Sequence, residues 1–116
     1  MFKALFVAAV AAALIALPAY ANSSAVKLKG EVGPGFKIEV QKNGKDLKTI
    51  KAGTYKIKIE DKSSIHNFHL SGPGVNKKTG VGAKGTFTWT VTLKKGTYKF
   101  VCDPHAAIMK GSFKVT

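Results

Sequence analysis

The sequence of 116 residues contains no arginine, one cysteine and, apart from the initiator, one methionine. The absence of arginine argues against nucleic acid as a partner, because arginine is the residue most used for bidentate recognition of bases and phosphates. The sequence also has no glycine-rich phosphate loop, no nucleophile paired with a base and no paired carboxylates near its histidines. We therefore expect a protein that is not an enzyme.

Lysine dominates the charge of the chain. Nineteen lysines stand against six acidic residues, which gives a formal net charge of +13 with neutral histidines. Such an excess speeds encounter with acidic partners and makes the encounter sensitive to salt. We therefore expect an acidic partner protein. An anionic membrane surface is an alternative, and so is a plain role of the lysines in solubility and in protecting strand edges.

The N-terminal residues have the layout of a secretory signal peptide. A short basic start at residues 1–3 precedes an apolar run at residues 4–17, and residues 18–21 end with an Ala-x-Ala pattern. The apolar run is shorter than the ~20 residues that span a bilayer, so a retained anchor is the weaker alternative. We predict cleavage after Ala21, a periplasmic or otherwise exported location, and a mature domain of residues 22–116 without a membrane span.

Alternation of apolar and polar residues predicts an all-β fold. The alternating segments are residues 26–29, 36–40, 55–60, 86–93, 98–102 and 112–115. In the clearest of them, Phe87, Trp89, Val91 and Leu93 share one face and four threonines share the other. The Asn43-Gly44 pair is a hairpin signal, and no segment has a convincing helical period. Half-buried antiparallel strands separated by turns predict a single two-sheet sandwich domain.

Three uncommon metal-binding residues lie close together near the C-terminus. They are Cys102, His105 and Met109, in the pattern Cys-x2-His-x3-Met, and His66 offers a second imidazole upstream. One thiolate, two imidazoles and a weak thioether form the trigonal copper site with a long axial methionine that serves electron transfer. A lone cysteine in an oxidising compartment cannot form an internal disulfide. Metal ligation accounts for it, and an inert buried cysteine is the plainer alternative.

These motifs, in this order, resemble the blue-copper cupredoxins, and most of all the small bacterial plastocyanin- and azurin-type proteins. His66-Asn67 is similar to the upstream ligand histidine and its asparagine, and residues 96–102 are similar to the strand that delivers the thiolate. Residues 102–109 resemble the ligand loop, and residues 111–115 resemble the closing strand. The resemblance extends over about residues 48–116.

The resemblance implies a Greek-key sandwich and one copper ion that alternates between Cu(I) and Cu(II). It implies His66, Cys102, His105 and Met109 as ligands, with Asn67 tying the ligand-bearing segments together by hydrogen bonds. It also implies electron transfer rather than catalysis. The gap of three residues between His105 and Met109 is one shorter than is usual in the plastocyanin-like form.

A second upstream histidine, His69, competes with His66. On a strand, His66 and Phe68 share one face while Asn67 and His69 share the other, so only one histidine can point at the ion. The family's His-Asn pattern selects His66, and we expect His69 to face outward and bind water. The alternatives are that His69 is the ligand, or that it forms part of a second, labile copper site.

Three classes of function remain. The first is an exported carrier of single electrons, a monomer that serves an acidic redox partner such as a cytochrome or an oxidase. In this carrier, docking would centre on His105 and the apolar residues 106–108. The second is a periplasmic copper-handling protein, for delivery or tolerance, that uses the same site. The third is a metal-free adhesive sandwich, which leaves the ligand set unexplained.

Overall fold

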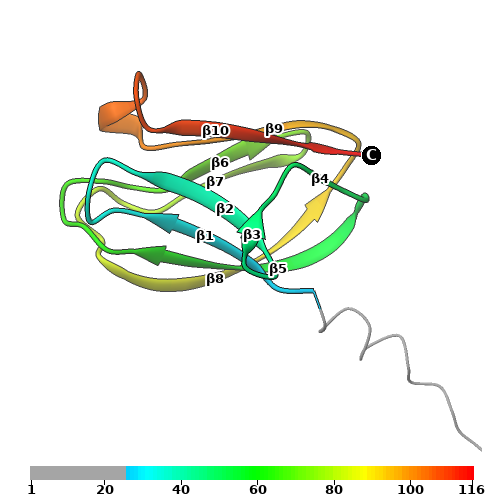
Figure 1. Cartoon of the computed structure of the whole chain (residues 1–116), viewed down its shortest axis with the longest axis horizontal. Coiled ribbons are helices and arrows are strands. Elements are labelled where there is room, and N and C mark those ends of the chain that lie inside the picture. Colours follow the sequence, from blue (N-terminus) through cyan, green and yellow to red (C-terminus); the bar gives the residue numbers. More distant parts are fainter. Residues whose placement is uncertain (1–25) are drawn as a thin grey trace, which may run out of the picture.

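The computed structural model describes residues 26–116, so the predicted signal peptide and its cleavage site lie outside the described residues. The chain folds into two five-stranded sheets that face each other (Figure 1). The first sheet has the order β3-β2-β1-β5-β8, with β1 at Leu28–Val32, β2 at Ile38–Lys42, β3 at Lys45–Asp46, β5 at Gly53–Asp61 and β8 at Gly85–Leu93. The second has the order β4-β10-β9-β6-β7, with β4 at Thr49–Ile50, β6 at His69–Gly72, β7 at Val75–Lys78, β9 at Gly96–Val101 and β10 at Lys110–Val115.

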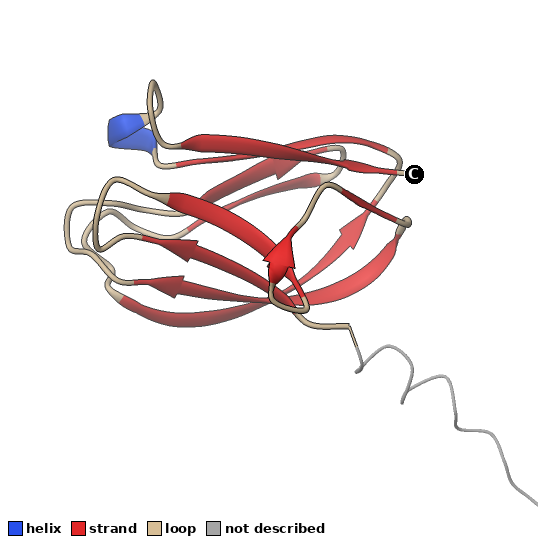
Figure 2. Ribbon diagram, viewed as in Figure 1, coloured by secondary structure: helices blue, strands red, loops and turns tan. Residues whose placement is uncertain are grey.

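The predicted all-β, two-sheet sandwich is confirmed (Figure 2). Each of the six segments with alternating residues overlaps a strand. β3, β4 and β7 were not predicted, because strands of two to four residues are too short to show a period. The strand expected around His66 begins only at His69, as β6. The sequence analysis also missed a single 3-10 turn at Asp103–His105. The hairpin signal is correct, since Asn43 and Gly44 join β2 to β3 with φ values of 49° and 85°.

Two strand pairs differ from the antiparallel arrangement that the alternation predicts. β1 pairs with β5 in parallel, and β10 pairs with β4 in parallel. After β3 the chain crosses to the second sheet for β4 and returns to the first for β5. This excursion supplies the long connection that a parallel pair needs. Side chains alternate in the same way in parallel and antiparallel pairs, so alternation cannot tell the two apart. The prediction of antiparallel pairing was therefore wrong at these two pairs.

The core lies between the two inner faces. Phe87, Trp89, Val91 and Leu93 point inward from β8, as predicted, while its threonines are exposed. Close packing leaves no room at some backbone positions. A Cβ on Gly30 would lie 2.6 Å from the ring of Phe68. The backbone of the first sheet can therefore come this close to the ring only because residue 30 is a glycine.

Apart from residues 47–48, which join β3 to β4, the strand registers divide the connections between two opposite ends of the sandwich. We call one the loop end; it consists of residues 33–37, 62–68, 79–84 and 102–109. We call the other the turn end; it consists of residues 26–27, 43–44, 51–52, 73–74, 94–95 and 116, with Lys42 and Lys45 beside the 43–44 turn. Figure 1 shows the turn end on the right, where the described chain also starts and finishes. Within residues 26–116, no helix has the length and apolar character needed to cross a bilayer.

Candidate metal centre

The thiol of Cys102 sits where β9 ends, and the chain after it closes into a compact loop. Pro104 lies in the first turn of the 3-10 helix. The N–H of His105 donates to the carbonyl of Cys102 at 3.0 Å, and the N–H of Met109 donates to the carbonyl of His105 at 2.9 Å. The N–H of Cys102 in turn donates to the carbonyl of Met109 at 3.0 Å. Backbone hydrogen bonds therefore fix all three candidate ligands of this loop relative to one another.

The structure brings His66, Cys102 and His105 together at the loop end. The Nδ1 atoms of the two imidazoles are 3.1 Å apart, and each lies 3.6 Å from the Sγ of Cys102. The point equidistant from three atoms with these separations lies about 2 Å from each. This is close to typical metal–nitrogen bonds of about 2.0–2.1 Å and somewhat shorter than metal–thiolate bonds of about 2.3 Å. Three donor atoms thus surround a space that fits one metal ion.

The chemistry of the donors fits copper. A thiolate and two imidazoles are soft to intermediate ligands, and this trigonal set is the one found in blue-copper sites. The imidazole planes are inclined at 83°, so the rings converge on the space instead of stacking. His66 and Cys102 are 0% exposed, whereas His105 is half-buried. His105 is therefore the donor nearest to solvent, as the sequence analysis expected.

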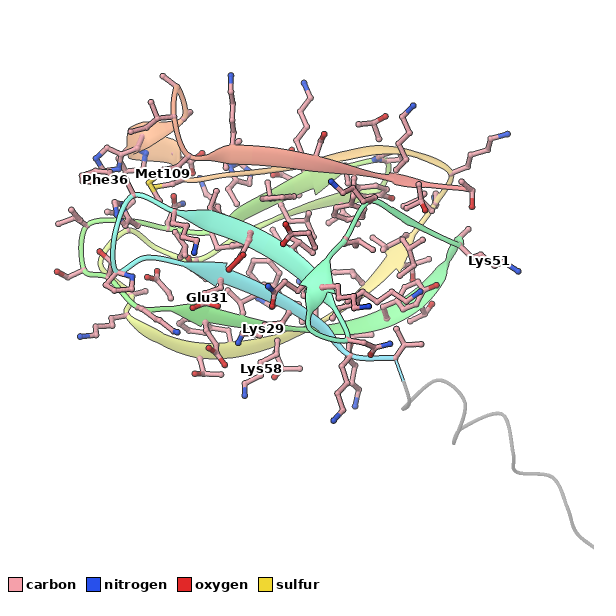
Figure 3. The ribbon with its side chains drawn as sticks, in the orientation of Figure 1. Lys29, Glu31, Phe36, Lys51, Lys58 and Met109 are labelled. Carbon is pink, nitrogen blue, oxygen red and sulfur yellow. The ribbon has the colours of Figure 1, made fainter. Side chains whose placement is uncertain are left out.

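Met109, the fourth predicted ligand, is 1% exposed and belongs to the same loop. Figure 3 shows it at the loop end near Phe36. Its burial removes the sulfur from water, as an axial ligand requires. An axial role for the sulfur stays a prediction.

Asn67 ties the two ligand-bearing segments together, which confirms the role that the resemblance implied. Its Nδ2 donates to the carbonyl of Thr79 at 3.1 Å and to Oδ2 of Asp103 at 2.8 Å. Its Oδ1 accepts from the N–H of Asp103 at 2.8 Å. The residue after His66 is thereby bonded to the residue after Cys102, and the side chain is 2% exposed. These bonds hold the donor atoms in place before a metal binds.

His69 is not one of the three converging donors. It lies on the outer side of the second sheet, as expected, but it binds protein groups instead of water alone. Its Nδ1 is 2.9 Å from Oδ1 of Asp103, and its Nε2 is 2.6 Å from Oδ1 of Asn76. One expectation was wrong: Asn67 does not share an outward face with His69, because β6 begins only at His69 and the residues before it form a loop.

The pair formed by His69 and Asp103 shifts the pKa of both groups. The hydrogen bond to Asp103 raises the pKa of His69, although burial opposes this. Burial acts to raise the pKa of Asp103, but hydrogen bonds from His69 and Asn67 outweigh it, and the pKa lies below its ordinary value. At neutral pH Asp103 therefore carries a negative charge next to the candidate thiolate ligand. Its hydrogen bonds to Asn67 and His69 hold that carboxylate in place.

Phe36 is a site residue that the sequence analysis missed. Its ring meets His66 and His105 edge to face, with centroid separations of 5.1 and 5.0 Å, and it is 60% exposed. The sequence analysis assigned it to a strand, but β2 begins only at Ile38. The Gly-Pro-Gly sequence before Phe36 signals a loop. The loop folds over the site and brings the ring of Phe36 against both imidazoles. This contact depends on tertiary packing, which the alternation of residues cannot predict.

Apolar side chains surround the site on the surface. Among the described residues, the exposed large hydrophobic side chains are Phe36, Ile65, Val81 and Ile108, and all four belong to the loop end. They come from four different connections. The exposed residues 106–108, predicted as a docking patch, are therefore one part of a wider apolar surface.

The fold and the donor set together define a blue-copper-type protein, and comparison with known proteins gives the family. The sequence profile described as "Copper binding proteins, plastocyanin/azurin family" matches residues 23–116. The chain belongs to this family. The match begins well before residue 48, where the sequence resemblance became specific.

Individual relatives match the chain either over a short segment or at low sequence identity. The chain is 61% identical to plastocyanin of Daucus carota over 36 residues, which are 30% of this chain and 36% of that protein. It is similar in fold to rusticyanin from Thiobacillus ferrooxidans, with a TM-score of 0.54 and 24% identity over 78% of this chain and 76% of the other. It is also similar to auracyanin A, a "blue" copper protein of Chloroflexus aurantiacus, with a TM-score of 0.55 and 20% identity over 78% and 98% of the two chains.

Proposed function

We propose that this protein is an exported carrier of single electrons and not an enzyme. His66, Cys102 and His105 would hold one copper ion, and Met109 would be a further, weak ligand. The observation that carries the proposal is the triangle of donors with sides of 3.1, 3.6 and 3.6 Å. Bound copper supplies a one-electron couple, and a cysteine thiolate with two histidines and a distant methionine suits that couple in electron transfer.

The chain's own residues keep the site rigid and dry. The bonds of Asn67 hold the two ligand-bearing loops together, and backbone hydrogen bonds within residues 102–109 limit how far the donors of that loop can move. Phe36 covers the two imidazoles with its ring, and both Cys102 and His66 are out of contact with water. A site whose geometry is imposed by the protein needs little rearrangement when its charge changes, which favours fast transfer.

We place the docking surface for redox partners at the loop end. His105 is the donor nearest to solvent, and exposed apolar side chains surround it. Exposed lysines at positions 37, 84 and 110 lie at the edge of this surface. A partner such as a cytochrome or an oxidase, with an apolar contact surrounded by acidic groups, would complement it. The protein would act as a monomer.

The test is a visible spectrum of the purified protein titrated with Cu(II). Thiolate ligation should give a strong charge-transfer band, and Cys102→Ala should abolish it. A wild-type copper complex without the band would overturn the blue-site proposal. A reversible one-electron couple with slow loss of copper to a chelator supports the carrier. Rapid transfer of copper to a chelator or acceptor protein would instead identify a copper-handling protein.

A further inference from the structure

The turn end of the molecule carries a concentration of positive charge that the copper site does not use. Six lysines lie there, at positions 27, 42, 45, 51, 94 and 95. All but Lys42 are exposed, and Asp46, which follows Lys45, places one carboxylate side chain beside them. Figure 3 shows Lys51 at this end, opposite Phe36 and Met109.

The fold converges these lysines from four separate segments. Lys42 and Lys45 are partners in the β2–β3 hairpin, and the carbonyl of Lys27 accepts from the N–H of Asn43 in the same hairpin. Lys51 precedes β5, whose first residue pairs with Leu93, the residue before Lys94. Long-range strand pairing therefore gathers lysines that are scattered in the sequence into two groups at this end, one of Lys27, Lys42 and Lys45 and one of Lys51, Lys94 and Lys95.

None of the six is neutralised within the described part of the chain. The lysines that form ion pairs there are Lys29, Lys58 and Lys62, which bind Glu31 and Glu60 on the outer side of the first sheet. Charges of both signs are thus interspersed on that sheet, while at the turn end six lysines stand against the single carboxylate of Asp46. Such a surface attracts anions over roughly a Debye length, about 10 Å at 0.1 M salt.

The composition of the turn end fits a lipid surface better than a protein. Specific protein interfaces are depleted in lysine and depend on aromatic or arginine anchors in their centre. The exposed large hydrophobic side chains of the described residues all lie at the loop end, so the turn end has no such anchor. Flexible lysines on several turns suit a plane of diffuse negative charge, as in polybasic membrane contacts.

The chain also enters the domain at this end. Val26, the first described residue, precedes Lys27 at the turn end (Figure 1). If residues 1–21 are removed, the new terminal ammonium group lies within a few residues of these lysines along the chain. If they are retained, the apolar run of residues 4–17 leads into the same end.

We propose that the turn end binds an anionic lipid surface of the phosphatidylglycerol type. This contact holds the loop end, with its three donor atoms and its apolar surface, facing away from the membrane. The inference goes beyond the proposed function, and it requires neither copper nor electron transfer. It gives a role to six of the lysines, which lie away from the surface where redox partners are proposed to dock.

The test is co-sedimentation of the protein, in the form recovered from cells, with phosphatidylcholine vesicles containing increasing phosphatidylglycerol. The test variant is Lys45→Glu with Lys94→Glu and Lys95→Glu. The matched control is Lys110→Glu with Lys99→Glu and Lys114→Glu, exposed lysines on the outer face of the second sheet. Both variants change the net charge equally, and circular dichroism checks that both fold. At about 0.05 M salt the turn-end variant should bind at least tenfold more weakly than the wild type, and the control less than threefold more weakly.

Three results would overturn the proposal. Equal losses in the two variants would show that only net charge matters and that no end is preferred. Equal binding to vesicles without phosphatidylglycerol would show attachment through apolar residues. Binding to poly-L-glutamate, with none to the charged vesicles, would assign the turn end to an acidic polypeptide. Because sedimentation reads protein mass alone, a failure here leaves the copper spectrum and its conclusion intact.

Discussion

The two ends of this sandwich differ in the length of their connections and in what those connections carry. At the turn end, four connections of two residues each join the strands, and lysines occupy or flank three of them. At the loop end, the connections have five to eight residues and carry the buried donors, the polar bridge of Asn67 and the exposed apolar side chains. A two-residue turn can do little more than reverse the chain. Longer loops on a rigid frame can enclose a site, so chemistry is concentrated there.

The largest expected effect separates two histidines of the loop end. His66→Ala removes one of the three converging donors and should abolish the visible copper band. His69→Ala should leave the band in place, because His69 binds Asp103 and Asn76 on the outer side. The measurement is the Cu(II) spectrum of both variants beside the wild type. Loss of the band in the His69 variant alone would reverse the assignment.

The next prediction compares the same substitution at the two ends. Ala107→Glu and Ala52→Glu each add one negative charge at an exposed residue, the first at the loop end and the second at the turn end. If partners dock around His105, Ala107→Glu should slow electron transfer about tenfold, since a buried unpaired charge at an interface costs roughly 1.4 kcal/mol or more. Ala52→Glu should have little effect. Stopped-flow kinetics with a redox protein would measure both, and equal rates would move the electron exit away from the loop end.

A smaller effect concerns Met109. Met109→Leu keeps the buried volume nearly unchanged and removes the sulfur. The visible band should persist, and the reduction potential should rise, because a weak donor that stabilises Cu(II) is lost. Voltammetry of the variant against the wild type checks this. An unchanged potential would show that the sulfur is not an axial ligand.

A substitution that loosens the turn end should lower the stability of the fold and leave the copper site unchanged. The hydroxyl of Tyr98 donates to the carbonyl of Pro73 at 2.6 Å and accepts from the N–H of Lys94 at 2.9 Å, which joins two of the short turns. Tyr98→Phe should lower the free energy of unfolding by about 1–2 kcal/mol, with no change in the copper spectrum. Denaturant titration of the apo and copper-loaded variant would measure it. A changed spectrum would contradict the separation of the two ends.

Much of the architecture could be predicted from local patterns. Alternation over residues 86–93 identified the strand and its buried face, and Asn43-Gly44 identified the hairpin. The spacing of Cys102, His105 and Met109 is also local, and it indicated a metal site directly. The position of Phe36 against two imidazoles could not be read in this way, because it depends on how separate loops pack.

The same limit applies to charge and to the outer polar groups. The sequence contains nineteen lysines, but only the strand registers show that six of them lie at the turn end. Likewise, His69 could be recognised as the outward histidine, whereas its partner Asp103 lies 34 residues along the chain. Local periodicity determines which face a side chain occupies, and pairing over long distances determines what it meets there.

The smallest expected effect concerns the pair of His69 and Asp103. Because the folded state raises the pKa of His69, the stability it contributes is full below about pH 6.5 and is lost as pH rises through the raised pKa. Because the pKa of Asp103 is lowered, its contribution is present above about pH 3.8 and is lost as pH falls through the lowered pKa. The pair therefore stabilises the fold most between these limits.

His69→Ala should lower the free energy of unfolding by about 0.5 kcal/mol near pH 5.5 and by less near pH 9. This size is typical of a partly exposed ion pair. Denaturant titrations of the apo protein at both pH values measure this. Lys58→Ala serves as the control, because it removes an ion pair with Glu60 on the other sheet and leaves His69 and Asp103 in place. A cost for His69→Ala that does not change with pH would show that the hydrogen bonds of His69 matter and its charge does not.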